Sequence, residues 1–291
     1  MEYSAFAPRC IPFVGRVTDF QTFGTLWVDN RICTVHGLRA VGKSYFVREF
    51  LRKTECRVLN CDLSCIDGVD SLYTILMTSI ENAPLQNLTS KNRWISHFTF
   101  RLAMYSKDTA CVVFLDNAEN SFDGLLGDHV FALCTTIVRK CPNVKVVVTS
   151  TKKIGFAELG RVYFTYELKP LRHSESKDLL KLVAPDVDFS VYCDVIVELC
   201  EGIPLLIVMI GSEMQYQMCK EKGGITPEQG VELLLQSRLK SWSGDCNTKD
   251  ENIVGKLNAI LYVKVMSASP SWAMFFVANK YLPLHIAQWR T

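Results

Sequence analysis

The sequence predicts an α/β domain with a mostly parallel, five-stranded sheet, followed by a small all-helical unit. Three observations lead to this prediction. Five short β-rich runs alternate with segments of helical spacing, the first run leads into a glycine-rich loop, and the strand pattern stops after Leu168. Alternation of strands and helices is typical of a parallel sheet with helices packed on its faces.

The composition is that of a globular protein with a hydrophobic core. The 291 residues are 48% hydrophobic and 21% charged, enough for one large domain or two modest ones. The net charge of +2 does not indicate a nucleic-acid or anionic-membrane partner. The N-terminal residues lack the pattern of a signal peptide, and the longest apolar stretch, Ile203–Ile210, is too short to span a bilayer. We therefore expect a cytoplasmic protein with no direct nucleic-acid or membrane partner.

The twelve cysteines are expected to be free thiols. Most of them lie inside apolar strand or helix patterns, where cysteine behaves as a small buried hydrophobic residue. The nearest arrangement to a metal-ligand pair is Cys61-x-x-x-Cys65, which has no matching second pair. Reduced thiols of a cytosolic protein are the interpretation that this pattern favours.

Five runs are predicted to form the strands. They are Arg31–His36, Cys56–Cys61, Cys111–Leu115, Val144–Thr149 and Val162–Leu168. The third run and the centre of the fourth are continuously apolar, as strands covered on both faces are. Between the second and third runs, Lys91–Ser106 has helical spacing, which places Trp94, Phe98, Leu102 and Tyr105 on one face. We interpret this stripe as core packing.

From Leu171 to Lys240 the pattern is helical throughout. One helix is expected from near Ser174 through Leu180, a second over Val191–Cys200, and a third from Pro204, since proline suits a first helical turn. A fourth is expected from Thr226, where Thr-Pro-Glu-Gln has the form of a capping box. The polar segment Lys240–Glu251 is the best candidate for a linker.

The glycine-rich loop GLRAVGKS, Gly37–Ser44, fits the phosphate-binding pattern G-x-x-x-x-G-K-[ST]. It follows the first predicted strand and opens a predicted helix, Ser44–Lys53, so that backbone N–H groups and a helix N-terminus point at an anion. Lys43 would reach the β- and γ-phosphates of ATP, and the Ser44 hydroxyl would ligate Mg²⁺. The residues predicted to contact ADP or ATP here are Gly37, Arg39, Ala40, Val41, Gly42, Lys43, Ser44 and Tyr45.

A second motif follows the third predicted strand, CVVFL, which ends in Asp116. An aspartate at the carboxyl end of a buried parallel strand lies at the edge where such sheets bind ligands. We therefore predict that Asp116 and Ser44 hold Mg²⁺ together. The two motifs, in this order and on separate strands, predict a P-loop NTPase fold.

The catalytic candidates are Asp116 and Glu119. Residue 117 is Asn, which cannot take a proton, so Glu119 is the nearest carboxylate that could activate water. The alternative is that Glu119 is a surface residue on a turn. Thr149 and Ser150, at the end of the fourth run, are placed to hydrogen-bond a γ-phosphate or the attacking water, or simply to cap the strand end.

The order of these motifs resembles the NB-ARC module of STAND-class ATPases, found in apoptosome scaffolds and plant disease-resistance receptors. The resemblance runs from about Phe13 to Met214, with a weaker continuation. Five segments carry it besides the phosphate loop: Phe13–Arg16, Leu115–Glu119, Val148–Thr151, Phe164–Leu171 and Gly202–Leu205. It implies that the backbone of Val14 contacts adenine and that Pro204 packs on the nucleotide from the helical subdomain.

The chain departs from this family at several positions. Arg39 and Ala40 stand where glycines are usual, and Asn117 replaces the second acid. Thr151 replaces the usual sensor arginine, and His285 has no following aspartate that would make a Met-His-Asp motif. Asn252–Leu282 resembles the opening of a winged helix. The expected division is therefore a P-loop domain at 1–168, a helical subdomain at 169–240 and a partial winged-helix-like segment at 241–291, in a fragment or a truncated product.

The resemblance implies an ADP/ATP-binding switch with Mg²⁺ in apoptosis- or innate-immunity-type signal transduction. Its nucleotide state would control subdomain closure and homo- or hetero-oligomerisation with related signalling proteins, with slow or no ATP hydrolysis. Two alternatives stay open. The chain could be an actively hydrolysing AAA-like or archaeal-type ATPase, or a truncated, non-catalytic regulator of full-length relatives. Asn117 and Thr151 favour the switch.

Overall fold

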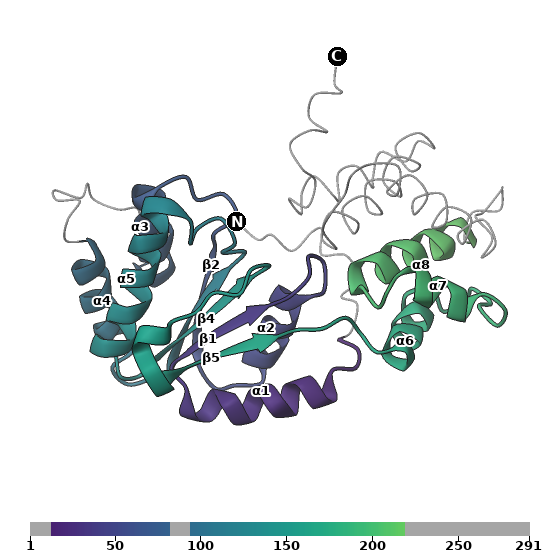
Figure 1. Ribbon diagram of the computed structural model, residues 1–291, viewed down its shortest axis with the longest axis horizontal. Helices are drawn as coiled ribbons and strands as arrows, with labels where there is room; N and C mark the ends of the chain where they lie inside the picture. Colours follow the sequence, from purple (N-terminus) through teal and green to yellow (C-terminus); the bar gives the residue numbers. More distant parts are fainter. Residues whose placement is uncertain (1–12, 82–93, 219–291) are drawn as a thin grey trace, which may run out of the picture. The chain divides into compact units, whose positions relative to one another are not determined.

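The computed structural model describes residues 13–81 and 94–218 (Figure 1). The described residues form two compact units. Among the described residues, the first unit contains those up to Glu175 together with Ile203–Leu205, and the second contains 176–202 and 206–218. The helix expected at Thr226, the linker, the winged-helix-like segment and His285 lie outside the described residues.

The first unit is built on one fully parallel sheet of five strands. These are β1 (Ile32–His36), β2 (Arg57–Asp62), β3 (Cys111–Asp116), β4 (Val144–Ser150) and β5 (Tyr163–Glu167). Their order is β2-β3-β4-β1-β5, and every neighbouring pair is parallel. The five predicted strands are therefore confirmed, each end within one residue of its prediction.

The register of β4 decides what stands between the two sequence motifs. β4 lies between β1 and β3, with Thr149 opposite Val35 of β1 and Val148 opposite Leu115 of β3. The phosphate loop leaves β1 and Asp116 ends β3, so the two motifs are one strand apart. Thr149 therefore lies between them at the carboxyl edge of the sheet.

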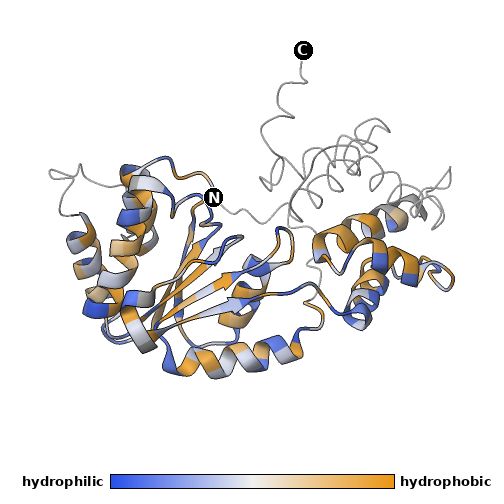
Figure 2. Ribbon diagram, viewed as in Figure 1, coloured by the Kyte–Doolittle hydropathy of each residue, from blue (hydrophilic) through white to orange (hydrophobic). Residues whose placement is uncertain are grey.

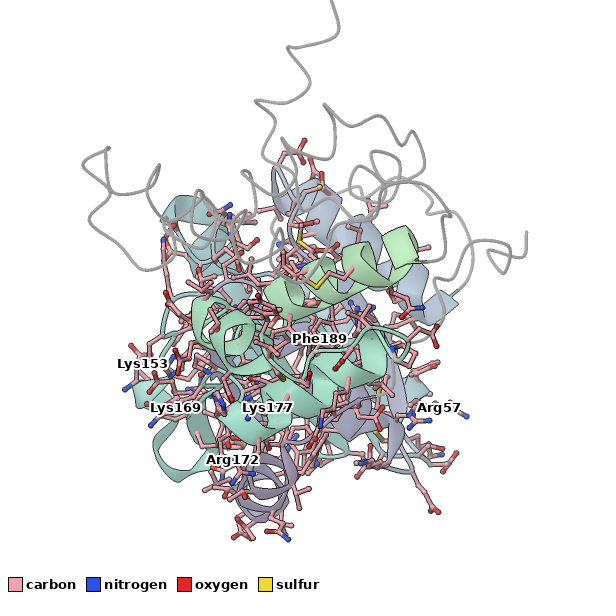
Figure 3. The ribbon with its side chains drawn as sticks, turned by 90° about the vertical axis from the view of Figure 1, so that its right-hand side faces the viewer. Arg57, Lys153, Lys169, Arg172, Lys177 and Phe189 are labelled. Atoms are coloured by element: carbon pink, nitrogen blue, oxygen red, sulfur yellow. The ribbon has the colours of Figure 1, made fainter. Side chains whose placement is uncertain are left out.

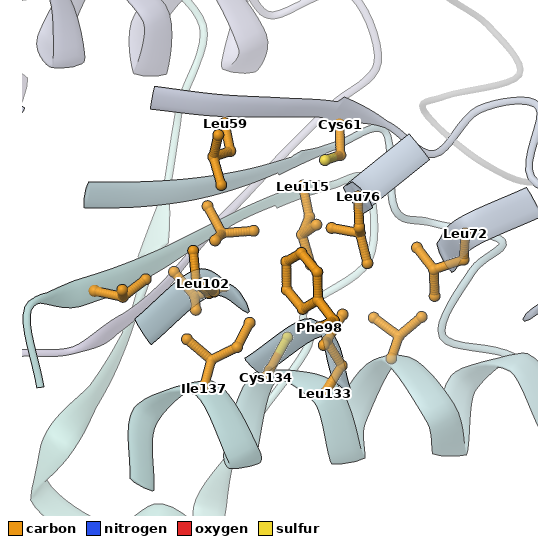
Figure 4. Close-up of a cluster of buried hydrophobic side chains, with 14 of the residues drawn as sticks. Leu59, Cys61, Leu72, Leu76, Phe98, Leu102, Leu115, Leu133, Cys134 and Ile137 are labelled. Carbon is orange, nitrogen blue, oxygen red and sulfur yellow. The ribbon is translucent and has the colours of Figure 1, made fainter. Parts of the chain in front are cut away.

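Helices cover both faces of this sheet (Figure 1). They are α1 (Val17–Asp29), α2 (Lys43–Arg52), α3 (Val69–Glu81), α4 (Trp94–Tyr105) and α5 (Gly124–Lys140), with a short 3₁₀ segment at Ala157–Val162. α1 and α2 pack on one face, where Phe23, Phe46 and Val47 join a buried cluster with Cys33 and Val35. α3, α4 and α5 pack on the other face around Phe98 and its neighbours (Figure 4).

The buried faces agree with the hydrophobic patterns of the sequence. The central strands are mainly apolar (Figure 2), and every residue of β3 is buried. On α4 the predicted stripe is confirmed, because Trp94, Phe98 and Leu102 are buried and Tyr105 packs against the same cluster. The sheet is thus held between two apolar layers, and its carboxyl edge is left for polar residues.

The described residues of the second unit form helices, as predicted. α6 (His173–Val183) begins in the first unit, α7 spans Cys193–Leu199, and α8 runs from Pro204 to Met218. Between α7 and α8, Glu201 and Gly202 both have positive φ. Gly211 lets α8 approach α6 closely, since a Cβ there would stand 3.0 Å from the Val183 side chain.

The packing on α4 predicts a difference between two phenylalanines of the same helix. Phe98 is 0% exposed and Phe100 is 63% exposed. We expect Phe98→Ala to lower the free energy of unfolding by about 3–5 kcal/mol, because it leaves a cavity in the core. The matched Phe100→Ala should change it by less than about 0.5 kcal/mol. Urea denaturation followed by circular dichroism measures both, and equal effects would contradict the assignment of the stripe to the core.

Candidate functional site

The phosphate loop has the backbone path that its glycines allow. Gly37 and Gly42 have φ values of 148° and 92°, and Ala40 has a φ of 65°. A Cβ on Gly37 would overlap the carbonyl oxygen of Leu168, so no other residue fits there. Of the neighbouring loop residues Arg39 and Ala40, Ala40 has a positive φ, whereas Arg39 is not among the positive-φ residues of the described chain. The expected backbone strain therefore falls on Ala40 alone.

Lys43 directs its ammonium group at the loop. Its Nζ donates to the carbonyl oxygens of Gly37, at 3.0 Å, and Leu38, at 2.9 Å. Lys43 is also the first residue of α2, and the first N–H groups of an α-helix have no acceptor within the helix. A lysine charge and a helix N-terminus are thus combined at one loop, which is the chemistry of an anion site.

Asp116 is the centre of the polar cluster at this edge of the sheet. Its carboxylate is 1% exposed. Oδ1 accepts hydrogen bonds from Ser44 Oγ, at 2.6 Å, and from Thr149 Oγ1, at 2.5 Å. Oδ2 accepts one from Arg48 Nη2, at 2.8 Å. The structure thus brings together the two residues that the sequence predicts as metal ligands, Ser44 and Asp116.

Sequence reasoning missed Arg48. Its signal was its position four residues after Ser44 on the predicted helix, which puts both side chains on one face. The acid at the end of β3 offered the complementary charge, but nothing in the sequence alone says that α2 lies over that strand end.

The Thr149 hydroxyl donates a hydrogen bond to the Asp116 carboxylate and accepts one from the backbone N–H of Asn117, at 3.0 Å. Asn117 in turn donates from Nδ2 to Asp62 Oδ1, at 3.1 Å, at the end of β2. In this arrangement Thr149 orients the carboxylate, and a direct bond to a phosphate stays a prediction. The Ser150 hydroxyl accepts the N–H of Lys152, at 3.0 Å, which is a local turn at the strand end.

Glu119 lies at the phosphate loop. Its Oε1 is 4.0 Å from Nη2 of Arg39, and its side chain is 18% exposed whereas that of Arg39 is 51% exposed. Glu119 therefore faces one of the loop residues predicted to contact nucleotide. Its role as a catalytic acid stays a prediction.

A second network joins the N-terminal motif to the loop. The buried Arg16 guanidinium donates from Nη2 to the Val41 carbonyl oxygen, at 3.0 Å, and from Nη1 to that of Lys169, at 2.6 Å. Its backbone N–H donates to Glu175 Oε1, at 2.8 Å. Arg16 thus holds together the loop, the segment after β5 and the segment before α1. The motif Phe13–Arg16 signalled this residue, but its contacts join distant parts of the chain.

The Glu175 carboxylate is also held by two hydrogen bonds from Arg172 and lies close to Gly15. Arg172 donates to its carboxylate from the backbone, at 3.0 Å, and from Nη2, at 2.9 Å. Burial acts to raise the pKa of Glu175, but the hydrogen bonds from Arg172 and Arg16 outweigh it and lower that pKa to about 2. Gly15 has a φ of 68°, and a Cβ on it would stand 2.7 Å from Cδ of Glu175, so a larger residue there would be strained and would push on this carboxylate. Lys169 and Arg172 are labelled in Figure 3.

The remaining predicted contact residues also lie near the loop. Tyr45, in the first turn of α2, packs its ring 5.6 Å from that of Phe13, and the half-buried Val14 is the next residue after Phe13. Pro204 belongs with the first unit, and a Cβ on Gly42 would stand 3.9 Å from its Cγ. The N-terminal motif and the proline therefore lie on the same loop region.

These residues fit a nucleotide with Mg²⁺. Because Ser44 gives its only proton to Asp116, its lone pairs are left for a metal ion, and oxygen is the donor that Mg²⁺ prefers. In the described parts of the chain, His, Cys, Asp and Glu form no group of three or more that could hold a metal ion. A Mg²⁺ ion at Ser44 would therefore rely on phosphate and water oxygens, as this ion usually does.

The described helices include none that is long and apolar enough to cross a membrane. No protein-family profile matches the chain. Uncharacterized proteins of Mycobacterium tuberculosis and Mycobacterium bovis are 26% identical to it over 210 residues, which make up 67% of this chain and 49% of each relative. The chain thus spans about half the length of these curated relatives.

Solved structures share the fold. A Walker-type ATPase of Pyrococcus abyssi is similar with a TM-score of 0.55 and 19% identity, over 87% of this chain and 77% of that one. Cdc6p of Pyrobaculum aerophilum gives 0.59 and 14%, over 87% and 72%. A STAND protein of Pyrococcus horikoshii with a tetratricopeptide-repeat sensor gives 0.51 and 12%, over 86% and 40%. The predicted P-loop NTPase fold is confirmed.

The Glu175 network predicts a pH dependence of stability. The folded-state pKa of this carboxyl lies below its ordinary value of 4.5, at about 2. Its contribution is therefore complete above about pH 5 and is lost as the pH falls from about 4.5 to 2. At pH 7, Glu175→Gln should destabilise by on the order of 1–3 kcal/mol, since hydrogen bonds to a charged group are lost.

Urea denaturation of both proteins between pH 7 and pH 3 tests this prediction. The gap between wild type and Glu175→Gln should narrow toward low pH. The exposed Glu158→Gln is the control and should track wild type throughout. A gap that stays constant down to pH 3 would contradict the lowered pKa.

Proposed function

We propose that the chain binds ADP or ATP with Mg²⁺ at the phosphate loop and acts as a nucleotide-dependent switch with slow or no hydrolysis. The observation that carries this proposal is the hydrogen bond between Ser44 and Asp116, 2.6 Å long, beside the loop that holds Lys43. It joins the two sequence motifs into one site. The Walker-type ATPase and the STAND protein among the similar structures support the same class.

Each residue has a defined task in this proposal. Lys43 would exchange the Gly37 and Leu38 carbonyls for phosphate oxygens, which are better acceptors for an ammonium group because they carry charge. The N–H groups of the loop and of the first turn of α2 would bind the same phosphates. Val14 would contact adenine, and Pro204 would pack on the nucleotide. Mg²⁺, when bound, bridges phosphate oxygens and neutralises their charge.

Slow hydrolysis follows from the groups around Asp116. Asn117 cannot act as a base, and its side chain amide is bonded to Asp62. The Thr149 hydroxyl proton is bonded to Asp116. Glu119, the remaining carboxylate that could accept a proton from water, lies 4.0 Å from Nη2 of Arg39, so its carboxylate is directed at a loop residue.

The switch would belong to NB-ARC-type signalling of the kind found in apoptosis and innate immunity. The Gly202–Leu205 motif and the likeness to a STAND protein support this class. Pro204 begins α8, whose residues from Leu206 belong to the second unit, so a nucleotide that contacts Pro204 and the loop would bias the arrangement of the subdomains if ADP and ATP favour different ones. Assembly with itself or with related signalling proteins would follow the nucleotide state.

An ordinary ATPase is the second candidate function. Glu119 is oriented toward the loop and is not fully exposed, which is the observation that favours it. The truncated-regulator alternative uses the same nucleotide site and differs in having no turnover.

Removal of Lys43 tests nucleotide binding. We expect Lys43→Ala to weaken binding of fluorescent ADP by roughly ten- to a hundredfold, because a charge-assisted hydrogen bond contributes about 1.5–3 kcal/mol. Lys53→Ala, at the other end of α2, is the matched control and should bind as wild type does. Equal affinity of all three folded proteins would sink the proposed site.

Turnover separates the switch from the enzyme. Single-turnover ATP hydrolysis should be well below about 1 s⁻¹, and retained ADP should be found after purification. Size-exclusion chromatography with ADP and then with a non-hydrolysable ATP analogue should show a change in assembly state. Hydrolysis at about 1 s⁻¹ or faster, abolished by Glu119→Gln, would favour the ordinary ATPase instead.

A further inference from the structure

Arg48 forms an ion pair with Asp116, so the chain itself supplies a positive charge beside this carboxylate. Its Nη2 lies 2.8 Å from Asp116 Oδ2, whereas Ser44 and Thr149 bring neutral hydroxyls to Oδ1. A carboxylate that is 1% exposed has lost its hydration and is stabilised by a nearby cation. At the end of β3 this cation is the guanidinium of Arg48.

The geometry leaves room for both Arg48 and a metal ion. Arg48 approaches Oδ2, and the hydroxyl of Ser44, the predicted metal ligand, lies on Oδ1. The guanidinium carbon is 5.9 Å from the ring centroid of Phe114, which helps to fix the arm beside β3. Arg48 therefore does not displace Ser44, but it neutralises the carboxylate that a metal ion at Ser44 would be attracted to.

We propose that Arg48 is a built-in counter-cation of Asp116 that partly takes the place of Mg²⁺, so that ADP binding depends only weakly on Mg²⁺. This inference rests on the proposed nucleotide site. A neutralised carboxylate attracts a second cation less than a free one does. Because the side chain of Arg48 is 52% exposed, solvent screens its charge, and we expect an effect of about tenfold and not more.

The test compares the affinity for fluorescent ADP in saturating Mg²⁺ with that in EDTA. For wild type, the two dissociation constants should differ by less than about tenfold. For Arg48→Gln the ratio of the dissociation constant in EDTA to that in Mg²⁺ should be about tenfold larger than for wild type, because Asp116 has then lost the charge of Arg48. Arg48→Lys keeps the charge and should resemble wild type. Arg52→Gln removes the same residue type one turn further along α2, where it pairs with Glu49, and is the matched control.

Each outcome decides something. The same Mg²⁺ dependence in wild type and Arg48→Gln would overturn the role of Arg48, while ADP binding by both would leave the proposed site standing. No ADP binding by folded wild type in either condition would overturn the proposed function and this inference with it. If Arg48→Gln does not fold, the wild-type measurement still tests the proposal. A loss of wild-type ADP affinity above about a hundredfold in EDTA would contradict a built-in counter-cation.

Discussion

The structure of this site depends on the burial of one carboxylate. Asp116 ends a strand on which every residue is buried, so its charge has to be compensated by protein groups. Ser44 and Arg48 reach it from α2 and Thr149 reaches it from β4. These bonds hold α2, the helix that follows the phosphate loop, against the end of β3, although β4 lies between β3 and the strand that leads into the loop, β1.

Arg16 makes a second set of hydrogen bonds, which connects the phosphate loop to the segment after β5. Its guanidinium binds a carbonyl of the loop and a carbonyl after β5, and its backbone binds Glu175. A shift of the loop at Val41 would therefore move the Arg16 side chain and alter the hydrogen bonds of this residue to Lys169 and Glu175. The phosphate loop and the segment leading to the helical unit thus share one side chain, Arg16.

The fold was largely predictable because its signals are local. Buried parallel strands read as short apolar runs, and all five were found within one residue of their ends. The stripe from Trp94 to Leu102 follows from helical periodicity alone. Helix α1 was not among the expected elements, and it begins after Arg16 in a left-handed conformation without a side-chain cap, so it lacks the usual start signal.

The sequence by itself determined the class of site, because a phosphate loop and an acid at a strand end are defined by spacing over a few residues. Only the tertiary structure decided the partners: Arg48 and Thr149 on Asp116, Arg39 facing Glu119, and Arg16 on the Val41 carbonyl. Each of these contacts joins segments separated by tens of residues. Their geometry follows from the strand order and from the helix that covers each face, which no local pattern contains.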